Sequence, residues 1–400
     1  MRYTLGELAE IIDGDRGKNY PQQNEFFDNG YCLFLNTGNV TNHGFSFEQN
    51  QFITKEKCDI LRKGKLQRGD IVYTTRGTVG NAAYYSEAVE YEHIRINSGM
   101  VIIRPNNDIV DTRFLYQILK SDYYRPFFKQ FCTGSAQPQL PIKNFSKIEL
   151  DIPALAIQTR IADILSAYDD LIENNQKQIK LLEEASQRLY KEWFVDLRFP
   201  GYENTPIIDG VPQGWKNGIL DDIVFESGKN EKKENRENYL YYLPIDCLPK
   251  QSIGYTHTSD ICLAESSLVA FSKNDIIFGA MRPYFHKVVV ARDSGLTRST
   301  CFVLNARESA FWAYVTMLMS SRDTVDYATQ ISVGTTMPYA RWKDLKQMPI
   351  IIPISKLAEE FQKNIKPIID KIEVLSKAIM ALRATRDCLL PKLMSGELEV

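Results

Sequence analysis

The chain has little histidine, no paired-cysteine motif and no long apolar run. Its four histidines, His43, His93, His257 and His286, do not stand at metal-ligand spacing from one another or from a cysteine. The seven cysteines are scattered without a Cys-x-x-Cys pair, a pattern typical of reduced thiols in the cytosol. No run reaches the length of a membrane span, and the first residues lack the apolar core of a signal peptide. We therefore expect a cytoplasmic protein without a metal site or a membrane segment.

Motifs for phosphate binding and catalysis are also absent. Residues 14–18 are too short for a phosphate-binding loop, and residues 77–80 lack the further glycine of a dinucleotide fingerprint. Asp169 and Asp170 are adjacent on a predicted helix, where their carboxylates point about 100° apart and cannot flank one scissile bond. The Asn/Asp-Pro-Pro-Tyr/Phe motif of amino-methyltransferases is missing. The sequence thus predicts a chain that is not an enzyme.

The net charge of −2 does not by itself indicate a nucleic-acid-binding protein. It does not exclude one, because acidic helices can offset a basic groove in the total. Two local basic clusters occur, Arg62, Lys63, Lys65 and Arg68 in one half and Arg341, Lys343 and Lys346 in the other. Solvated surface charge is the simpler interpretation of either cluster alone.

What the sequence does contain is an internal repeat with a period close to 200 residues. Gly134, Pro138 and Pro153 recur as Gly334, Pro338 and Pro353. A period of this length indicates a duplicated domain-plus-helix unit rather than a solenoid. Two like units in one chain can sit about a pseudo-twofold axis. The repeat is clearest in the last third of each half, which favours a shared frame that carries two divergent recognition surfaces.

The pattern of strands, turns and helices predicts an α+β fold of two similar globular domains and two long helices. The domains are expected at residues 1–153 and 215–353, the long helices at 154–196 and 354–400, and a linker rich in proline and glycine at 197–214. Within the domains, shorter helices are expected at 112–129 and 309–321, and a strand at 96–104. Pro367 is expected to kink or restart the second long helix.

Apolar residues recur at heptad spacing in both long helices. The first seam is Tyr168, Ile172, Asn175, Ile179, Leu182, Ser186, Leu189 and Trp193. The second contains Ile372, Leu375, Ile379, Leu382 and Leu389. Antiparallel pairing of the helices as a coiled coil would bury both seams, separate the two domains and offer an assembly surface. Asn175 and Ser186 either fix register or partner choice, or are core polar groups with local partners.

Several motifs are similar to those of one known family. Residues 134–140, 148–153 and 156–165 resemble the junction between recognition domain and helix in specificity subunits of type I restriction-modification systems. Residues 192–201 resemble the family's central region, 211–215 the entry to its second recognition domain, and 389–398 its C-terminal ending. The resemblance covers the whole order of domains, although residues 353–362 keep less of the usual junction.

The resemblance implies that each domain is a target-recognition domain that reads one half of an asymmetric, bipartite DNA target. The helices would set the spacing between the halves and bind two methyltransferase subunits. Restriction subunits would then join the complex. S-adenosylmethionine, ATP and magnesium would be bound by these partner subunits, and this chain would bind no cofactor itself.

Polar loop tips that follow strands are the expected DNA contacts, because Arg and Lys match guanine edges and Asn and Gln match adenine edges. In the first domain the candidates are Thr74, Thr75, Arg76, Thr78, Ser135, Gln137 and Gln139. In the second they are Arg282, Tyr284, His286, Thr335, Thr336 and Tyr339. Lys143 and Lys343 are expected on phosphates. An ordinary turn remains the alternative at each position.

Three other functions stay open from the sequence. The chain could be a DNA reader that works without a methyltransferase, an autonomous nuclease or hydrolase with an unrecognised site, or a coiled-coil scaffold. Co-purification of a methyltransferase, metal-dependent cleavage by the isolated chain, and salt-sensitive DNA binding separate these functions.

Overall fold

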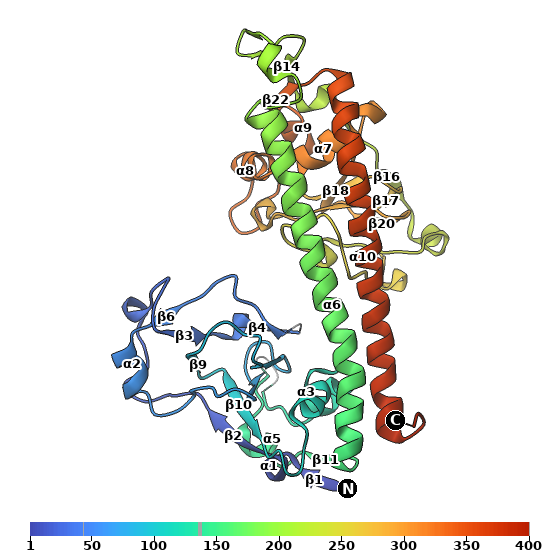
Figure 1. The fold of residues 1–400 in the computed structure, drawn as a ribbon. Coiled ribbons are helices and arrows are strands. Elements are labelled where there is room, and N and C mark those ends of the chain that lie inside the picture. The colour runs from blue at the N-terminus through green and yellow to red at the C-terminus, as the bar shows by residue number, and fades with distance from the viewer. Residues whose placement is uncertain (43, 135–137, 400) are drawn as a thin grey trace. The chain divides into compact units, whose positions relative to one another are not determined.

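The computed structural model describes residues 1–42, 44–134 and 138–399. The chain divides into two compact units, one of Met1–Asp170 with Arg383–Val400 and one of Leu171–Leu382. Each unit combines small sheets with short helices and with parts of two long helices (Figure 1). The protein is therefore a mixed helix and sheet fold.

The first unit is built around a four-stranded antiparallel sheet in the order β2-β10-β7-β8. Its strands are β2 (Ala9–Asp13), β7 (Ile71–Thr74), β8 (Ala82–Tyr84) and β10 (Met100–Pro105). Successive side chains of a strand point to opposite faces. Ile71 and Tyr73 accordingly pack in one core, and Val72 packs in another on the opposite face. Because both faces are covered, the central strand β7 is buried throughout.

Smaller elements cover the two faces of this sheet. The first face carries helices α1 (Leu5–Leu8), α3 (Thr112–Lys120), α4 (Arg125–Lys129) and α5 (Ile142–Phe145), and the two-stranded sheet of β1 (Arg2–Thr4) and β11 (Glu149–Asp151). The second carries the sheet β6-β3-β9, made of β3 (Cys32–Leu35), β6 (Phe52–Ile53) and β9 (Ile94–Ile96), with α2 (Lys55–Ile60) beyond it, and the pair β4 (Val40–Thr41) and β5 (Gly44–Phe45).

The second unit has a four-stranded antiparallel sheet in the order β15-β21-β18-β19. Its strands are β15 (Val224–Glu226), β18 (Ile276–Gly279), β19 (Val288–Val290) and β21 (Cys301–Ala306). A three-stranded sheet contains β16 (Lys229–Glu231), β17 (Leu268–Phe271) and β20 (Gly295–Arg298). There are also two two-stranded sheets. One pairs β14 (Lys216–Ile219) with β22 (Pro349–Ile352), and the other pairs β12 (Ile207–Ile208) with β13 (Val211–Pro212). The helices are α7 (Trp312–Met319), α8 (Arg322–Gln330) and α9 (Trp342–Leu345).

The central strand of each four-stranded sheet begins in the same way. Asp70 accepts a hydrogen bond from the amide of Gln67 (2.7 Å), and Asp275 accepts one from the amide of Ser272 (2.7 Å). Both carboxylates are buried. This shared turn aligns β7 with β18 residue by residue, which allows the loops that follow the two strands to be compared.

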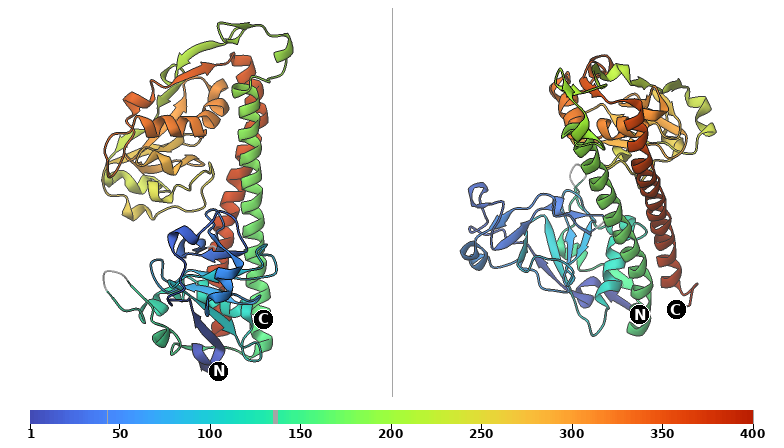
Figure 2. Two further views of the ribbon diagram at one scale, coloured as in Figure 1. Left: turned by 90° about the vertical axis from the view of Figure 1, so that its left-hand side faces the viewer. Right: turned by 45° about the horizontal axis from the view of Figure 1, so that its top comes forward.

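Two long helices contribute to both units. They are α6 (Leu155–Tyr190), which continues as a π-helical turn over Lys191–Val195, and α10 (Ser355–Ser395). Within the second unit α6 and α10 lie side by side and antiparallel (Figures 1 and 2). The ring of Phe361, near the start of α10, lies 5.6 Å from that of Trp193 and 6.5 Å from that of Tyr190. Aromatic packing thus closes this end of the helix pair.

Two local predictions were wrong, and of a third, a kink or a restart at Pro367, the restart was wrong. The helix expected at 112–129 is divided into α3 and α4, because the Ser121 hydroxyl accepts from the Tyr123 amide and stops the first helix. The strand expected at 96–104 is divided into β9 and β10, because Asn97 caps the Gly99 amide (2.9 Å) in a turn. Finally, α10 does not restart at Pro367. This proline is on the exposed side of α10, where one missing amide donor is tolerated.

No helix among the described residues is long and apolar enough to cross a membrane. The same part of the chain contains no cluster of His, Cys, Asp and Glu that could hold a metal ion. All seven cysteines are free. Whether the chain works without a cofactor stays a prediction.

Candidate nucleic-acid interface

Two loops of the first unit are held together by backbone hydrogen bonds, and we call residues 74–81 and 133–140 the first loop pair. Gln139 forms antiparallel bridges with both Arg76 and Thr133. The Thr133 amide donates to the Gln139 carbonyl (2.7 Å), and the Leu140 amide donates to the Thr75 carbonyl (2.9 Å). The predicted residues Arg76 and Gln139 are therefore brought to one place, from segments far apart in the sequence.

Thr74 and Thr75 support this loop pair from inside. Both are buried, and their hydroxyls donate to the carbonyls of Thr78 (2.5 Å) and Gly99 (3.1 Å), respectively. Their side chains thus shape the loop and do not reach its surface. Thr78 is exposed, Arg76 is half-buried, and Gln139 is exposed. Of the candidates, Arg76, Thr78 and Gln139 can reach a ligand directly.

The remaining candidates of this unit lie nearby or outside the described residues. Lys143 is exposed on α5, which follows the second loop of the pair directly. Ser135 and Gln137 belong to residues 135–137, outside the described part of the chain. Gly134 has a φ of 85°, a left-handed conformation that glycine adopts without strain.

A third segment joins the first loop pair, and the sequence analysis did not identify it. Thr37 lies in the 3₁₀ turn η2 (Thr37–Asn39), and a Cβ atom at Gly99 would lie 2.8 Å from its methyl group. A Cβ atom at Gly77 would lie 3.9 Å from the Thr37 hydroxyl oxygen. The turn is fixed by Asn36, whose side chain accepts from the Gly38 amide (2.8 Å). The sequence Asn-Thr-Gly-Asn at residues 36–39 could have indicated this turn, since Asn side chains often cap turns of this kind.

The second unit contains an equivalent arrangement, residues 279–286 and 333–340, which we call the second loop pair. Tyr339 forms antiparallel bridges with Met281 and Val333. The Ala340 amide donates to the Ala280 carbonyl (3.0 Å), as Leu140 does to Thr75 in the first unit. Met281 therefore occupies the place of Arg76. Arg282, the candidate named from the sequence, is the next residue. The match of Met281 with Arg76 depends on the alignment of β18 with β7, which was not visible in the sequence.

Arg282 occupies the place of Gly77, and it too has a left-handed backbone (φ 50°). Its amide donates to the Pro338 carbonyl (2.7 Å), and its guanidinium approaches the Thr336 carbonyl (3.4 Å). Thr335 and Thr336 are exposed beside it. Burial raises the pKa of the Tyr339 phenol, which therefore remains a hydrogen-bond donor. These four candidates are brought together on the second loop pair, and Lys343 is exposed on α9, which follows it.

Tyr284 and His286 belong to the same loop but also line a groove of the second unit. The groove, of about 530 Å³, lies between this loop, α8 and the second-unit part of α6. The His286 ring is hydrogen-bonded to the Ser320 carbonyl (2.9 Å), and its backbone is left-handed (φ 52°). Tyr284 is 49% exposed. His286 therefore acts as a structural contact in this arrangement, whereas the Tyr284 ring is free to meet a ligand.

Comparison with known proteins points to one family. Residues 1–184 match the family described as Type I restriction modification DNA specificity domain. The type I restriction enzyme MjaIX specificity subunit of Methanocaldococcus jannaschii is 28% identical over 358 residues, covering 83% of this chain and 78% of that protein. The HindI specificity subunit of Haemophilus influenzae is 23% identical over 470 residues, covering 98% of this chain and 100% of that protein. These matches support a type I restriction-modification specificity subunit.

The fold agrees with these matches. The crystal structure of the type I restriction-modification S subunit from M. genitalium is similar with a TM-score of 0.58 and 15% identity, covering 98% of this chain and 96% of that one. As a specificity subunit, the chain is a non-catalytic member of its system. The resemblance seen in the sequence is thereby confirmed at the level of the family.

In this specificity subunit the helix seam is used largely for contacts within the chain. In the second unit Ile172, Ile179, Trp193, Ile372, Leu375 and Ile379 are buried in one core, with Leu182, Leu189 and Leu382 packed against it. In the first unit Leu389 packs against the core and Tyr168 is half-buried. Ser186 is buried and donates to the Leu182 carbonyl (2.9 Å), a local partner, and Asn175 is half-buried.

Apolar side chains off the seam remain exposed. Leu181 is 65% and Val374 59% exposed on the second-unit parts of α6 and α10, and Leu171 is 50% exposed. The heptad pattern missed these residues because they lie outside its core positions. They are among the exposed apolar side chains of the two long helices.

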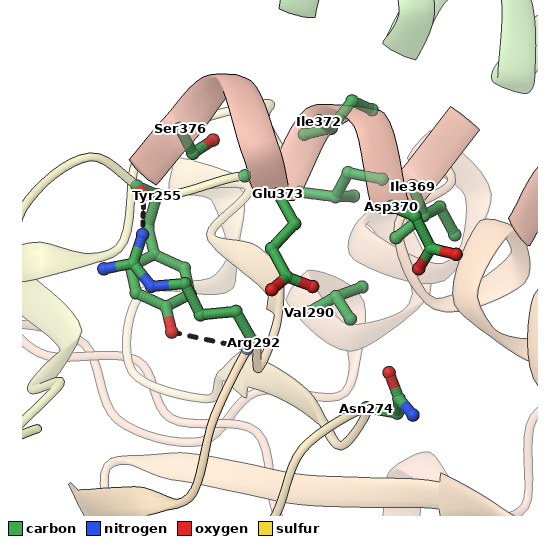
Figure 3. A pocket seen from close by; sticks show the side chains of 11 residues that line it. Tyr255, Asn274, Val290, Arg292, Ile369, Asp370, Ile372, Glu373 and Ser376 are labelled. Carbon is green, nitrogen blue, oxygen red and sulfur yellow. Dashed lines mark hydrogen bonds between the residues drawn. The ribbon is translucent and has the colours of Figure 1, made fainter. Parts of the chain in front are cut away.

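Buried charges fix the long helices to each unit. In the first unit Asp169 of α6 accepts hydrogen bonds from Lys120, Gln117 (2.6 Å) and Arg386 of α10 (2.7 Å). In the second, Arg292 stacks on the ring of Tyr255 (4.2 Å) and donates to the Tyr255 carbonyl (3.2 Å) beneath α10 (Figure 3). A cavity of about 20 Å³ separates this arginine from Ser376, enough for roughly one water molecule. These contacts position the helices and are not ligand sites.

Proposed function

We propose that this specificity subunit reads an asymmetric, bipartite DNA target, with one half read by each loop pair. The supporting observation is that both loop pairs follow the central strand of a sheet with the same strand order, yet carry different side chains at matched places. Arg76 and Gln139 stand where the second unit has Met281 and Tyr339. A shared frame with different contact residues fits two readers of different sequences.

The side chains of the first loop pair suit base edges in the major groove. An arginine matches the two acceptors of guanine, and a glutamine matches the donor and acceptor of adenine. The second pair offers two threonines, one arginine and the ring of Tyr339, whose hydroxyl donates to the Ser299 carbonyl (3.3 Å). Lys143 and Lys343 follow directly after the loops, where they suit phosphate oxygens and would position each unit without adding sequence information.

The repeat also supports a domain organisation. We propose recognition domains at residues 1–153 and 215–353, long helices at 154–196 and 354–400 and a linker at 197–214, with the two halves related by a pseudo-twofold axis. The long helices would set the spacing between the half-targets. Leu171, Leu181 and Val374 would contribute to binding two methyltransferase subunits, since their apolar surface is exposed without a partner in the chain.

The chemistry would then reside in the partners, as expected of a cytoplasmic restriction-modification complex. The methyltransferase subunits would bind S-adenosylmethionine and modify the target adenine, and restriction subunits would use ATP and magnesium. This chain would supply DNA sequence recognition and would bind none of these cofactors.

Base-resolution mapping of methylated adenine in the host, with and without this gene, tests the proposal. We expect one asymmetric, two-part motif to disappear with the gene. Restoring the gene with Arg76→Ala should change only one half of the motif, and Thr336→Ala only the other. A methylome that does not depend on the gene would contradict the proposal and would favour a reader that works without a methyltransferase.

A further inference from the structure

Four cationic side chains of the first unit form one exposed surface, which we call the basic edge: Lys18, Arg62, Lys63 and Lys65. The segments that carry them are in contact. The Arg62 amide donates to the Asp15 carboxylate (2.8 Å), and a Cβ atom at Gly17 would lie 2.8 Å from the Arg62 guanidinium. The charges are thus gathered in space as well as along the sequence.

The positive charge of the basic edge is not neutralised within the chain. None of the four side chains forms an ion pair with any residue that the structure describes. Asp15 lies between the two segments, but its carboxylate is 5% exposed and accepts from the amides of Gly17 (2.7 Å) and Arg62 (2.8 Å). These hydrogen bonds lower the pKa of Asp15, and the one from the Gly17 amide has the largest effect. The carboxylate is turned inward, so the solvent side of the edge is cationic.

A single turn connects the basic edge with the first loop pair. Arg16, between Asp15 and Gly17, donates from its guanidinium to the Ser98 carbonyl (3.3 Å). The next carbonyl, that of Gly99, accepts from the amides of Thr75 (2.9 Å) and Arg76 (3.1 Å). Residues 97–99 therefore contact the proposed reading loop on one side and the basic segment on the other. A polymer bound at Arg76 can continue onto the basic edge.

The second unit allows a comparison at matched positions. Asp70 and Asp275 precede the strands β7 and β18 and accept the same kind of hydrogen bond. If these two residues are matched, residues 62–66 correspond to residues 267–271. The pairing of β2 with β10 and of β15 with β21 aligns residues 14–18 with 229–233. The two alignments agree with each other. In the second unit β16 pairs with β17, and in the first unit the matched residues 14–18 likewise lie beside residues 62–64.

At these matched positions the second unit carries fewer cations, and none in the segment that matches residues 62–66. Arg62, Lys63 and Lys65 correspond to Ser267, Leu268 and Ala270. Arg16 corresponds to Glu231, and Lys18 to Lys233, which is paired with Glu265 (3.1 Å). Gly14 and Gly17 correspond to Lys229 and Lys232, which are exposed. The same backbone frame thus carries five cations in the first unit and three in the second, where Lys233 is paired with Glu265. Since the frame is kept, the difference lies in the side chains alone.

We propose that the basic edge binds the phosphate backbone of double-stranded DNA beside the half-target read by the first loop pair, and that the second unit makes fewer such contacts. This inference rests on the proposed function. Duplex DNA carries about one negative charge per 1.7 Å of helix axis, so a strip of unpaired cations next to a reading loop meets phosphates over several base pairs. The edge adds affinity but no sequence preference, and the footprint on DNA extends further at the first half-target than at the second.

The test uses the complete complex with its methyltransferase subunits and the variant Lys18→Ala/Lys63→Ala/Lys65→Ala. These three side chains are exposed, whereas Arg62 is kept because it packs over Gly17. Each lost phosphate contact lowers the slope of log affinity against log salt by about 0.9, so we expect the slope to fall by roughly 2 to 3 and the affinity by about 10- to 100-fold. The protected DNA should shorten at the first half-target, and the methylated motif should stay the same.

The matched control is Lys216→Ala/Lys229→Ala/Lys232→Ala in the second unit, which removes the same charge from exposed positions. Lys229 and Lys232 stand at positions matched to the basic edge, but Ser267, Leu268 and Ala270 add no charge beside them. We expect the salt slope of this control to fall by less than that of the first variant. An unchanged slope in the first variant would overturn the proposal, and an equal loss in both would overturn the asymmetry. Loss of methyltransferase co-purification with an unchanged DNA slope would show that the edge binds an acidic protein surface instead. If the wild type directs no methylation motif, the proposed function has failed, which is a distinguishable result.

Discussion

Arg76 and Gln139 face each other across an antiparallel bridge, although they belong to loops from opposite parts of the first unit's sequence. The bridge is made by the backbone, so their side chains are left for other contacts. Thr74 and Thr75, just before Arg76, are buried and anchor the loop from below. The arginine and the glutamine are therefore held at the tip of a supported loop, as base-reading residues must be.

Replacing Arg76 with alanine should relax recognition at one position of one half-target. A bidentate arginine–guanine contact contributes about 1–3 kcal/mol of discrimination, so methylation should spread to sites that differ at that base pair. Thr78→Ala, at an exposed neighbour in the same loop, should change the motif less. The measurement is the methylated motif of each variant together with its DNA affinity. Full retention of both by Arg76→Ala would exclude this residue as a base reader.

Arg282→Gly should stabilise the protein and at the same time weaken its DNA binding. The left-handed backbone of Arg282 costs a non-glycine residue about 1–2 kcal/mol, and a glycine removes that cost. The matched change Gly77→Ala should act in the opposite direction, because Gly77 has a φ of 71°. Thermal unfolding of both variants checks the two signs. If Arg282→Gly unfolds at a lower temperature, the contacts of Arg282 outweigh its backbone strain.

Asp169→Asn should destabilise the first unit strongly. Asp169 is the shared acceptor of Lys120 and Arg386, and burial lowers the pKa of Lys120 to about 8 even beside this carboxylate. Removing the acceptor's charge leaves the buried Lys120 without its acidic partner and Arg386 with Asp387 alone (2.7 Å), at a cost of about 3 kcal/mol. Asp163→Asn is the control on the same helix, since its ion pair with Arg113 is exposed and should contribute less than about 1 kcal/mol. Equal losses in a denaturant titration would contradict a special role for Asp169.

The long helices and the repeat could be predicted from the sequence because heptad spacing and the positions of glycine and proline are local signals. Gly134 and Gly334 could be matched in this way, and both have left-handed backbones. The match of Arg76 with Met281 could not, since it depends on strand register, which is set by hydrogen bonds between distant segments. Thr74 looked like a contact residue because polar residues at loop tips are usually exposed, yet its hydroxyl is consumed by the loop itself. Charge at the basic edge was visible, but its significance appeared only when the matched residues of the second unit could be placed.

The carboxyl group of Glu183 makes the stability of the second unit depend on pH. It lies on α6 and accepts hydrogen bonds from the Ser252 hydroxyl (2.6 Å) and the Ile253 amide (2.8 Å). Burial is the largest effect on this group, and it raises the pKa of Glu183 above 4.5. In the window between 4.5 and the raised pKa, the folded state binds more protons than the unfolded state. The contribution to stability is therefore complete below pH 4.5 and is lost as the pH rises through the folded pKa.

Glu183→Gln should remove this dependence, because an amide accepts the same hydrogen bonds without ionising. We expect the variant to match the wild type near pH 4 and to become more stable than it as the pH rises, until the difference levels off above the folded pKa. Glu184→Gln changes an exposed neighbour on the same helix and should follow the wild-type profile throughout. Unfolding temperatures measured from pH 4 to pH 8 provide the comparison. Parallel profiles for Glu183→Gln and the wild type would mean that Glu183 is ionised in the folded protein as readily as in the unfolded chain, and that the loop at Ser252 binds a charge without cost.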